Sequence, residues 1–186
     1  MITVKSTASL SLILILALAR PLAAQVAETT PAVPAADPAD VESVDAIIAA
    51  TYDVISGAAG EARDWDRFRS LFRPGAKIIP SGMRPDTTLF IAFWSPDEYI
   101  QRAGAGLEAN GFFEVEVNRV QEQFGQIVHL FSTYESRKNA DDVKPFQRGI
   151  NSFQLVNDGQ RWWVVNIFFQ GESPSSPIPE RYLPKM

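Results

Sequence analysis

The sequence predicts an α+β domain in which one curved antiparallel sheet wraps around about three helices. Apolar residues recur at helical spacing in three segments of the first half, 41–56, 64–72 and 95–110. Runs rich in Val, Ile, Phe and Tyr then fill 112–170, separated by two short turns that contain glycine and by one longer loop at 139–147. Because the helices come first and the long strands afterwards, the pattern favours segregated layers over alternating strand–helix units.

The first two helices are each predicted to begin at an aspartate. Asp40 precedes segment 41–56, and its carboxylate can accept hydrogen bonds from the N–H groups of the first turn. Gly57 and the small residues after it end that helix. Asp64 is the expected N-cap of the second helix, which Pro74 stops.

The third helix has the clearest start in the chain. Ser95 and Glu98 match a capping box, in which each side chain accepts a hydrogen bond from the other residue's backbone N–H. Gly111 is the predicted end of this helix. Two short strands, 76–80 and 89–94, are expected before it, around a loop rich in Pro and Gly.

Four long strands follow, and the turns between them suggest how they pair. Asp158 and Gly159 form the strongest hairpin signal, and a two-residue turn there pairs Asn157 with Gln160. The strands are predicted at 112–123, 126–138, 148–157 and 160–170.

The other two turns complete the expected register. The longer loop places Glu135 opposite Asn151, and a tight turn at Gly125 places Val115 opposite Tyr134. Since neighbours along a strand point to opposite faces, these pairings decide which side chains share a face. One face is then nearly all apolar, with a few neutral polar groups, and we expect it to be concave and to meet the helices.

The second face mixes carboxylates and amides with large apolar side chains. Such a mixture is typical of a protein–protein interface rather than of open solvent. We therefore expect a homodimer through this convex face, on which His129 has a structural or interface role. The expected interface residues are Glu114, Phe131, Glu135, Asn151, Phe153, Trp162, Val164 and Asn166.

The N-terminal segment 1–24 is predicted to be a signal peptide. Lys5 precedes an apolar run at 8–19, and small residues follow that suit cleavage after Ala24. The run is too short to span a bilayer, so we expect a periplasmic or secreted protein with no membrane attachment after signal removal. The rest of the chain divides into a flexible leader 25–40, the domain 41–171 and an irregular tail 172–186.

Composition narrows the classes of partner and cofactor. The net charge is −5 and no basic stripe occurs, which argues against nucleic acid as a partner. The chain has one histidine and no cysteine, so a transition-metal site is not expected. No glycine-rich phosphate loop or nucleophile elbow occurs, and we predict no cofactor.

The order of elements and the amino-acid sequences of several segments resemble the NTF2-like superfamily, which includes SnoaL-like and ketosteroid-isomerase-like domains. The resemblance is to an exported bacterial group without an assigned activity. It implies a conical sheet with a pocket at its open end, and frequently a dimer through the outer face of the sheet. The segments are 52–57 (YDVISG), 64–68 (DWDRF), 132–137 (STYESR), 148–152 (RGINS) and 161–165 (RWWVV).

The expected concave face suggests a binding pocket for a small molecule. Its neutral polar groups lie among apolar side chains, which is the usual composition of such a pocket. We expect Trp94 and Tyr99, near the rim, to add aromatic walls. The predicted function is thus to bind a small, largely apolar molecule. The ligand-binding candidates are Tyr52, Trp94, Ser132, Tyr134, Ser152, Gln154 and Trp163.

Whether the protein is an enzyme stays open at this point. The resemblance implies a carboxylate or histidine base within the cone, yet the expected register places none on the concave strands. A lyase, isomerase or hydrolase would need Asp53 or Glu135 as base, with Tyr134 as hydrogen-bond donor. If the strand parity is wrong, the row that contains Glu114 and Asn151 lines the pocket instead. A further alternative is an envelope interaction protein without a ligand.

Overall fold

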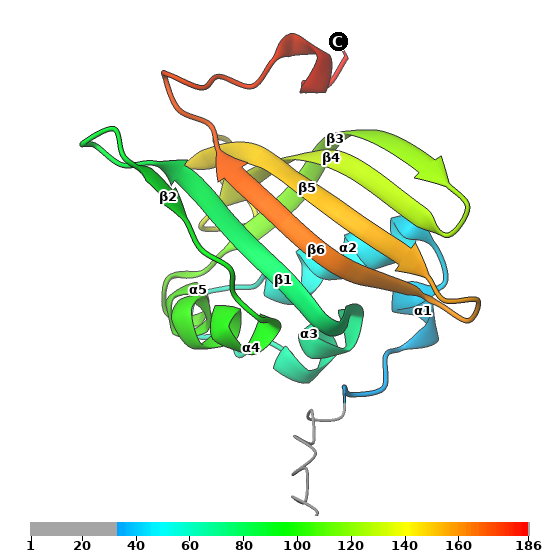
Figure 1. The fold of residues 1–186 in the computed structure, drawn as a ribbon. Helices are drawn as coiled ribbons and strands as arrows, with labels where there is room; N and C mark the ends of the chain where they lie inside the picture. Colours follow the sequence, from blue (N-terminus) through cyan, green and yellow to red (C-terminus); the bar gives the residue numbers. More distant parts are fainter. Residues whose placement is uncertain (1–32, 186) are drawn as a thin grey trace, which may run out of the picture. The chain divides into compact units, whose positions relative to one another are not determined.

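The structure, a computed structural model, describes residues 33–185. The predicted signal peptide 1–24 and the first part of the leader lie outside the described residues. Within the described part, six strands form one curved sheet, and the helices gather on one side of it (Figure 1). The predicted α+β class is confirmed. No helix among the described residues is long and apolar enough to cross a membrane.

The helices begin where the sequence offers caps, with one change at the first. Ser43, and not Asp40, caps the long helix: its backbone is extended and its hydroxyl accepts from the N–H of Ala46. Asp40 lies instead in a short preceding helix and pairs with Arg67. The helices are α1 (Pro38–Val41), α2 (Val44–Ile55), α3 (Trp65–Leu71), α4 (Pro96–Tyr99), a π-helical turn (Ile100–Gly104) and α5 (Ala105–Asn110).

The other predicted helix starts are confirmed. Asp64 caps α3 by accepting from the N–H of Arg67. Ser95 and Glu98 form both hydrogen bonds of the capping box at α4. From there the chain continues through the π-helical turn into α5, which ends at Gly111 with φ 69°, a left-handed conformation that suits glycine.

The sheet has the strand order β2-β1-β6-β5-β4-β3. Every neighbouring pair is antiparallel except β1 and β6, which are parallel, so the sheet is mixed rather than wholly antiparallel. The strands are β1 (Phe72–Met83), β2 (Leu89–Ile91), β3 (Phe113–Phe124), β4 (Ile127–Arg137), β5 (Gln147–Asn157) and β6 (Trp162–Gly171).

The observed register of β5 differs from the expected one and turns this strand over. Ser132 of β4, and not Glu135, lies opposite Asn151. Pairing begins earlier along β5 than expected, because Phe146 donates its N–H to the carbonyl of Ser136 and Gln147 lies opposite Ser136. The offset is an odd number of residues, so side chains expected on the convex face point inward.

The β5–β6 hairpin and β6 also depart from the expected pairing. Asn157 pairs with Trp162 rather than Gln160, because the Asp158 carboxylate accepts from the N–H groups of Gln160 and Arg161 and closes a longer loop. A bulge between the pairs made by Val164 and Asn166 then reverses the parity within β6.

The core lies between the inner face of the sheet and α2. Phe153 and Val164, expected at a dimer interface, are 1% and 0% exposed within the domain. Trp162 also belongs to this core. The expectation that these three residues form an interface is wrong, since the register shifts turn them to the inner face.

The C-terminal tail covers part of the outer face, where we expected irregular structure. It contains a 3-10 helix (Glu180–Tyr182). The Tyr182 ring stacks on Phe131 with ring centroids 5.4 Å apart, and its carbonyl accepts from the Thr133 hydroxyl at 2.6 Å. The tail lies on the side of the sheet opposite helices α1 to α5 (Figure 1), and Phe131 packs against it there.

Candidate functional site

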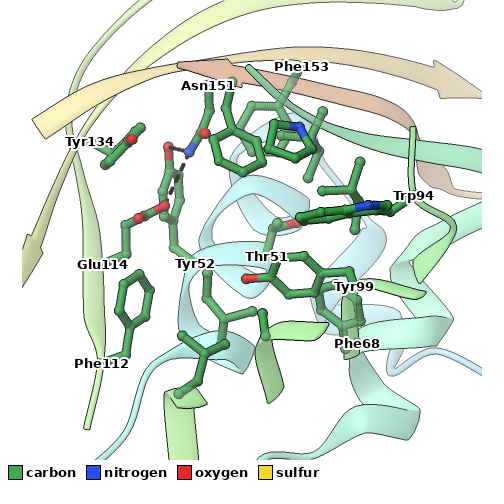
Figure 2. A pocket seen from close by; sticks show the side chains of 17 residues that line it. Thr51, Tyr52, Phe68, Trp94, Tyr99, Phe112, Glu114, Tyr134, Asn151 and Phe153 are labelled. Atoms are coloured by element: carbon green, nitrogen blue, oxygen red, sulfur yellow. Dashed lines mark hydrogen bonds between the residues drawn. The ribbon is translucent and has the colours of Figure 1, made fainter. Parts of the chain in front are cut away.

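A cavity of about 280 Å³ lies between the inner face of the sheet and helices α2, α4 and α5. Its walls are mostly aromatic and aliphatic. Trp94 and Tyr99 lie across the cavity from Glu114 and Asn151 (Figure 2). The aromatic residues of the lining are Tyr52, Phe68, Trp94, Tyr99, Phe112, Tyr134, Phe153 and Phe169.

Glu114 of β3 is the one acidic residue among the described residues that line this pocket. Its Oε2 accepts from the Ser136 hydroxyl at 2.8 Å, and its Oε1 accepts from the Asn151 amide nitrogen at 3.2 Å. Burial raises the pKa of Glu114 to about 7, although both hydrogen bonds favour the charged form. The carboxyl group can therefore both take and give a proton near neutral pH.

A bulge in β3 turns Glu114 toward the pocket. The register of β3 against β4 slips by one residue between Glu116 and Asn118, so Glu116 lies opposite Tyr134. Val115, expected to face inward, lies opposite Glu135 and is 46% exposed. The expectation that Glu114 belongs to the convex face is therefore wrong.

Asn151 and Tyr52 extend the polar cluster around Glu114. The Asn151 amide nitrogen donates to the Tyr52 hydroxyl oxygen at 3.0 Å as well as to Glu114 (Figure 2). The Tyr52 hydroxyl is 2.6 Å from the Ser132 hydroxyl. Burial, together with the charge of Glu114, raises the pKa of Tyr52 above its usual range, so the phenol stays protonated.

Two further phenols, Tyr134 and Tyr99, line the pocket. For each, burial and then the charge of Glu114 raise the pKa above its usual range, so both can donate hydrogen bonds at neutral pH. Gly149 makes room for Tyr134, because a Cβ at this position would overlap the Tyr134 hydroxyl.

The expected ligand-binding residues divide into two groups. Tyr52, Trp94 and Tyr134 line the pocket. Ser132 lies directly behind it, bonded to Tyr52. The remaining candidates were assigned to the wrong face by the register errors: Ser152 is 3.4 Å from His129 on the outer face, and Gln154 shares that face.

Trp163 is the last of these misassigned candidates. Its indole N–H donates to Asp158 at 2.7 Å, and Arg161 lies over its ring. This places the side chain beside the β5–β6 turn, away from the pocket lining.

Neither of the expected catalytic carboxylates faces the pocket. Asp53 lies on α2 with its side chain 68% exposed and pairs with Arg67 at 2.6 Å. Glu135 points to the outer face and pairs with Arg137. Among the described residues, no group of three or more His, Asp or Glu side chains is arranged to hold a metal ion.

The expected interface row is split between the two faces of the sheet. Glu114 and Asn151 line the pocket, whereas Glu135 and Asn166 stay on the outer face. Phe112 was not expected in the pocket at all. No local signal could identify it, because its position depends on an isolated bridge to Gly57.

Comparisons with known proteins show similarity in structure and none in sequence. No family model matches the chain, and no curated protein matches it. A protein of unknown function with a cystatin-like fold from Nostoc punctiforme is 13% identical, with a TM-score of 0.52 over 70% of this chain and 89% of that one. A protein of unknown function from Mycobacterium tuberculosis is also 13% identical, with a TM-score of 0.54 over 74% of this chain and 75% of that one.

An NTF2-like protein of unknown function from Shewanella baltica is 14% identical, over 68% of this chain and 89% of that one, with a TM-score of 0.44. At identities this low, the similarities with a TM-score above 0.5 show a shared fold and leave activity open.

Proposed function

We propose, on the premise that this chain has an NTF2-like fold, that it is an acid–base enzyme of the isomerase or dehydratase kind. One observation supports the proposal above all others. The carboxyl group of Glu114 faces an aromatic pocket, and burial raises its pKa to about 7. A carboxyl group tuned in this way is suited to general acid–base catalysis at neutral pH.

The pocket indicates the class of substrate. Its aromatic and aliphatic walls favour a small, largely apolar and neutral molecule, in a cavity of about 280 Å³. Tyr134 and Tyr99 supply hydroxyl donors, so the substrate should present at least one oxygen acceptor, such as a ketone.

The chemistry follows from the positions of the acid and the donors. Glu114 removes a proton from the carbon next to the substrate carbonyl, and the electron pair moves onto the carbonyl oxygen. Tyr134 donates a hydrogen bond to that oxygen as negative charge develops on it. In a β,γ-unsaturated ketone, the electron pair returns through the neighbouring double bond and the protonated Glu114 gives its proton to the γ-carbon, which completes an isomerisation. In a β-hydroxy ketone, the enolate re-forms the carbonyl and a carbon–carbon double bond while the bond from the β-carbon to the hydroxyl breaks, and Glu114 gives its proton to that departing hydroxyl, which completes a dehydration.

A binding protein without chemistry is the second candidate. The observation that favours it is the lining itself, in which aromatic and aliphatic side chains far outnumber polar ones. On this alternative, Glu114 and Asn151 would only orient a bound molecule through hydrogen bonds.

Exchange of deuterium into simple ketones separates the two candidates. We expect the protein to accelerate exchange at the carbon next to the carbonyl of small bicyclic ketones, β-tetralone among them, followed by proton NMR. The rate should rise with pH through a midpoint at about pH 7, as Glu114 loses its proton, and then level off. Glu114→Gln should slow exchange by about 10²–10⁴-fold.

Asp53→Asn is the matched control, because it neutralises an exposed carboxylate outside the aromatic pocket. Exchange should be unchanged in this variant. Ketone binding without deuterium exchange would contradict the enzyme proposal. An exchange rate that is the same in Glu114→Gln as in the unaltered protein would also contradict it.

We also propose that the protein is exported and forms a homodimer. Cleavage near Ala24 can be tested by mass spectrometry of the mature N-terminus. A homodimer would have to use side chains that the outer face leaves exposed, such as Phe168 at 41%, since Phe153 and Val164 lie in the core. Sedimentation of the Phe168→Asp variant against the unaltered protein tests this.

A further inference from the structure

A second carboxylate, Glu116, lies two residues beyond Glu114 on the same side of β3, outside the aromatic pocket. It borders a groove between α2 and β3 that Glu114 and Tyr52 also line. Arg119 binds Glu116 through Nε at 3.0 Å and Nη2 at 2.6 Å, and reaches Asp45 through Nη1 at 2.6 Å. Arg119 and Glu116 thus form a bidentate ion pair, with Nε on Oε1 and Nη2 on Oε2.

Hydrogen bonds connect Glu116 to Glu114 through three intervening side chains. The Ser132 hydroxyl is 2.5 Å from Glu116 Oε1 and 2.6 Å from the Tyr52 hydroxyl. Asn151 Nδ2 is 3.0 Å from that same phenol oxygen and 3.2 Å from Glu114 Oε1. The chain of contacts passes from β3 through β4, α2 and β5 and returns to β3.

The direction of every bond in this chain follows from the carboxylate at its outer end. A carboxylate only accepts, so Ser132 must donate its single hydrogen to Glu116. Ser132 then accepts from Tyr52, whose own hydrogen is used in that bond. The Tyr52 oxygen can therefore only accept from Asn151, which requires the amide nitrogen to face it.

We propose that Glu116 is a positioning residue, which through Ser132 and Tyr52 holds the Asn151 amide with its nitrogen, and not its oxygen, toward Glu114. The amide nitrogen stabilises the carboxylate form of Glu114, whereas the amide oxygen would oppose it. The inference rests on the proposed function only for its effect on catalysis. The orientation of the amide can be measured without any turnover.

The surroundings of Glu114 contain few groups other than the Asn151 amide that can stabilise its charged form. Inside the aromatic pocket, the titratable groups that face Glu114 are phenols: Tyr52 from α2, Tyr99 from α4 and Tyr134 from β4. In the groove between α2 and β3, the charged side chains Asp53, Glu116 and Arg119 share the lining with Glu114. No cationic side chain among the described residues lines the pocket. Asn151 and Ser136 are thus the two side-chain donors that favour the charged form of Glu114.

Glu116→Gln tests the proposal because it reverses the direction of the hydrogen bond between residue 116 and Ser132. Arg119 would bind the amide oxygen of the new side chain and leave its nitrogen to donate to Ser132. Ser132 would then donate to Tyr52, and Tyr52 would donate to Asn151, whose oxygen would have to face the phenol. With this oxygen beside Glu114, we expect the pKa of Glu114 to rise by about one pH unit.

The direction of the Glu114 pKa shift distinguishes transmission through the hydrogen-bonded side chains from a direct effect of the charge at position 116. Removing the negative charge of Glu116 and leaving Arg119 less neutralised should lower the pKa of Glu114 if only charge acted. The measurement is a titration of the full-length protein labelled with ¹³C at the glutamate carboxyl groups, assigned by comparison with Glu114→Gln. A downward shift, or none, in the Glu116→Gln variant would overturn the proposal.

Two further variants keep the test decisive. Ser132→Ala cuts the chain and frees the Asn151 amide to turn, so it should raise the pKa of Glu114 alone, with no added rise from Glu116→Gln. An equal rise from Glu116→Gln in both backgrounds would contradict transmission through Ser132. Asp45→Asn is the matched control, because it changes a partner of Arg119 outside the chain and should leave Glu114 unchanged.

The two proposals can fail separately. If ketone exchange is absent while the Glu116→Gln titration shifts upward, the positioning role stands and the enzyme proposal falls. If exchange depends on Glu114 while the titration does not respond to Glu116, the reverse holds. When both proposals hold, the midpoint of the pH–rate profile should move upward with the titration.

Discussion

The inner face of the sheet has two ends that differ in packing, although the same strands β4 and β5 form both. At one end, Leu130 and Leu155 are 0% and 2% exposed and join Ile47 of α2 in the core. At the other end, Tyr134 and Asn151 border a cavity of about 280 Å³. The first may be called the closed end and the second the open end.

The comparison shows where this fold can tolerate a buried acid. At the closed end, apolar side chains of the sheet and α2 fill the space, and a carboxylate there would lose its hydration without compensation. At the open end, Ser136 and Asn151 offer hydrogen bonds, and the pocket gives Glu114 partial access. Burial still raises the pKa of Glu114, so the charged form of this side chain costs stability in its folded environment.

The largest predicted effect compares one leucine at each end. Leu130→Ala should lower the free energy of unfolding by about 3–4 kcal/mol, because a fully buried side chain leaves a cavity. Leu107→Ala should cost only about 1 kcal/mol, since Leu107 is partly exposed and already borders a cavity. Urea unfolding of both variants measures the difference. Equal losses would remove the distinction between the two ends.

The next effect concerns the loss in free energy of unfolding that the charged form of Glu114 causes at the open end. The folded protein binds this proton more tightly than the unfolded chain, whose glutamates titrate at about 4.3. The stability that this proton supplies is therefore complete below about pH 4.3 and is lost as the pH rises to about 7. Glu114→Gln should match the unaltered protein in acid and exceed it by about 3 kcal/mol above pH 7.

Urea midpoints for the two proteins across this pH range provide the measurement. A stability difference that does not change with pH would mean that the folded protein does not raise the pKa of Glu114.

The smallest predicted effect concerns the space that glycine leaves at the open end. Gly149→Ala would bring a Cβ against the Tyr134 hydroxyl and the Gln170 carbonyl, and should cost about 2 kcal/mol. Gly106→Ala in α5 is the matched control, because nothing lies within 4 Å of its Cβ and alanine favours a helix. Thermal unfolding should separate the two. Equal midpoints would show that Tyr134 has room to move.

Local sequence signals were sufficient to predict the helices and strands, but they were insufficient to predict which residues line the pocket. Asp64, and the capping box of Ser95 and Glu98, marked helix starts because a cap depends on residues within one turn. The inward face of β4, with Leu130 and Tyr134, was also predicted correctly. Glu114 and Phe153 were assigned to the wrong face, since each assignment depended on counting residues through a turn or a bulge.

The sequence by itself determined the α+β class, the starts of the second and third predicted helices and the approximate spans of the four long strands, because hydrophobic period and capping are local properties. Only the tertiary structure decided which side of each strand meets the helices. A one-residue bulge in β3 and an odd offset in β5 brought Glu114 and Asn151 to the pocket. In a strand with a side-chain period of two, one residue of slip exchanges the two faces, and no local preference opposes it when both faces contain apolar residues.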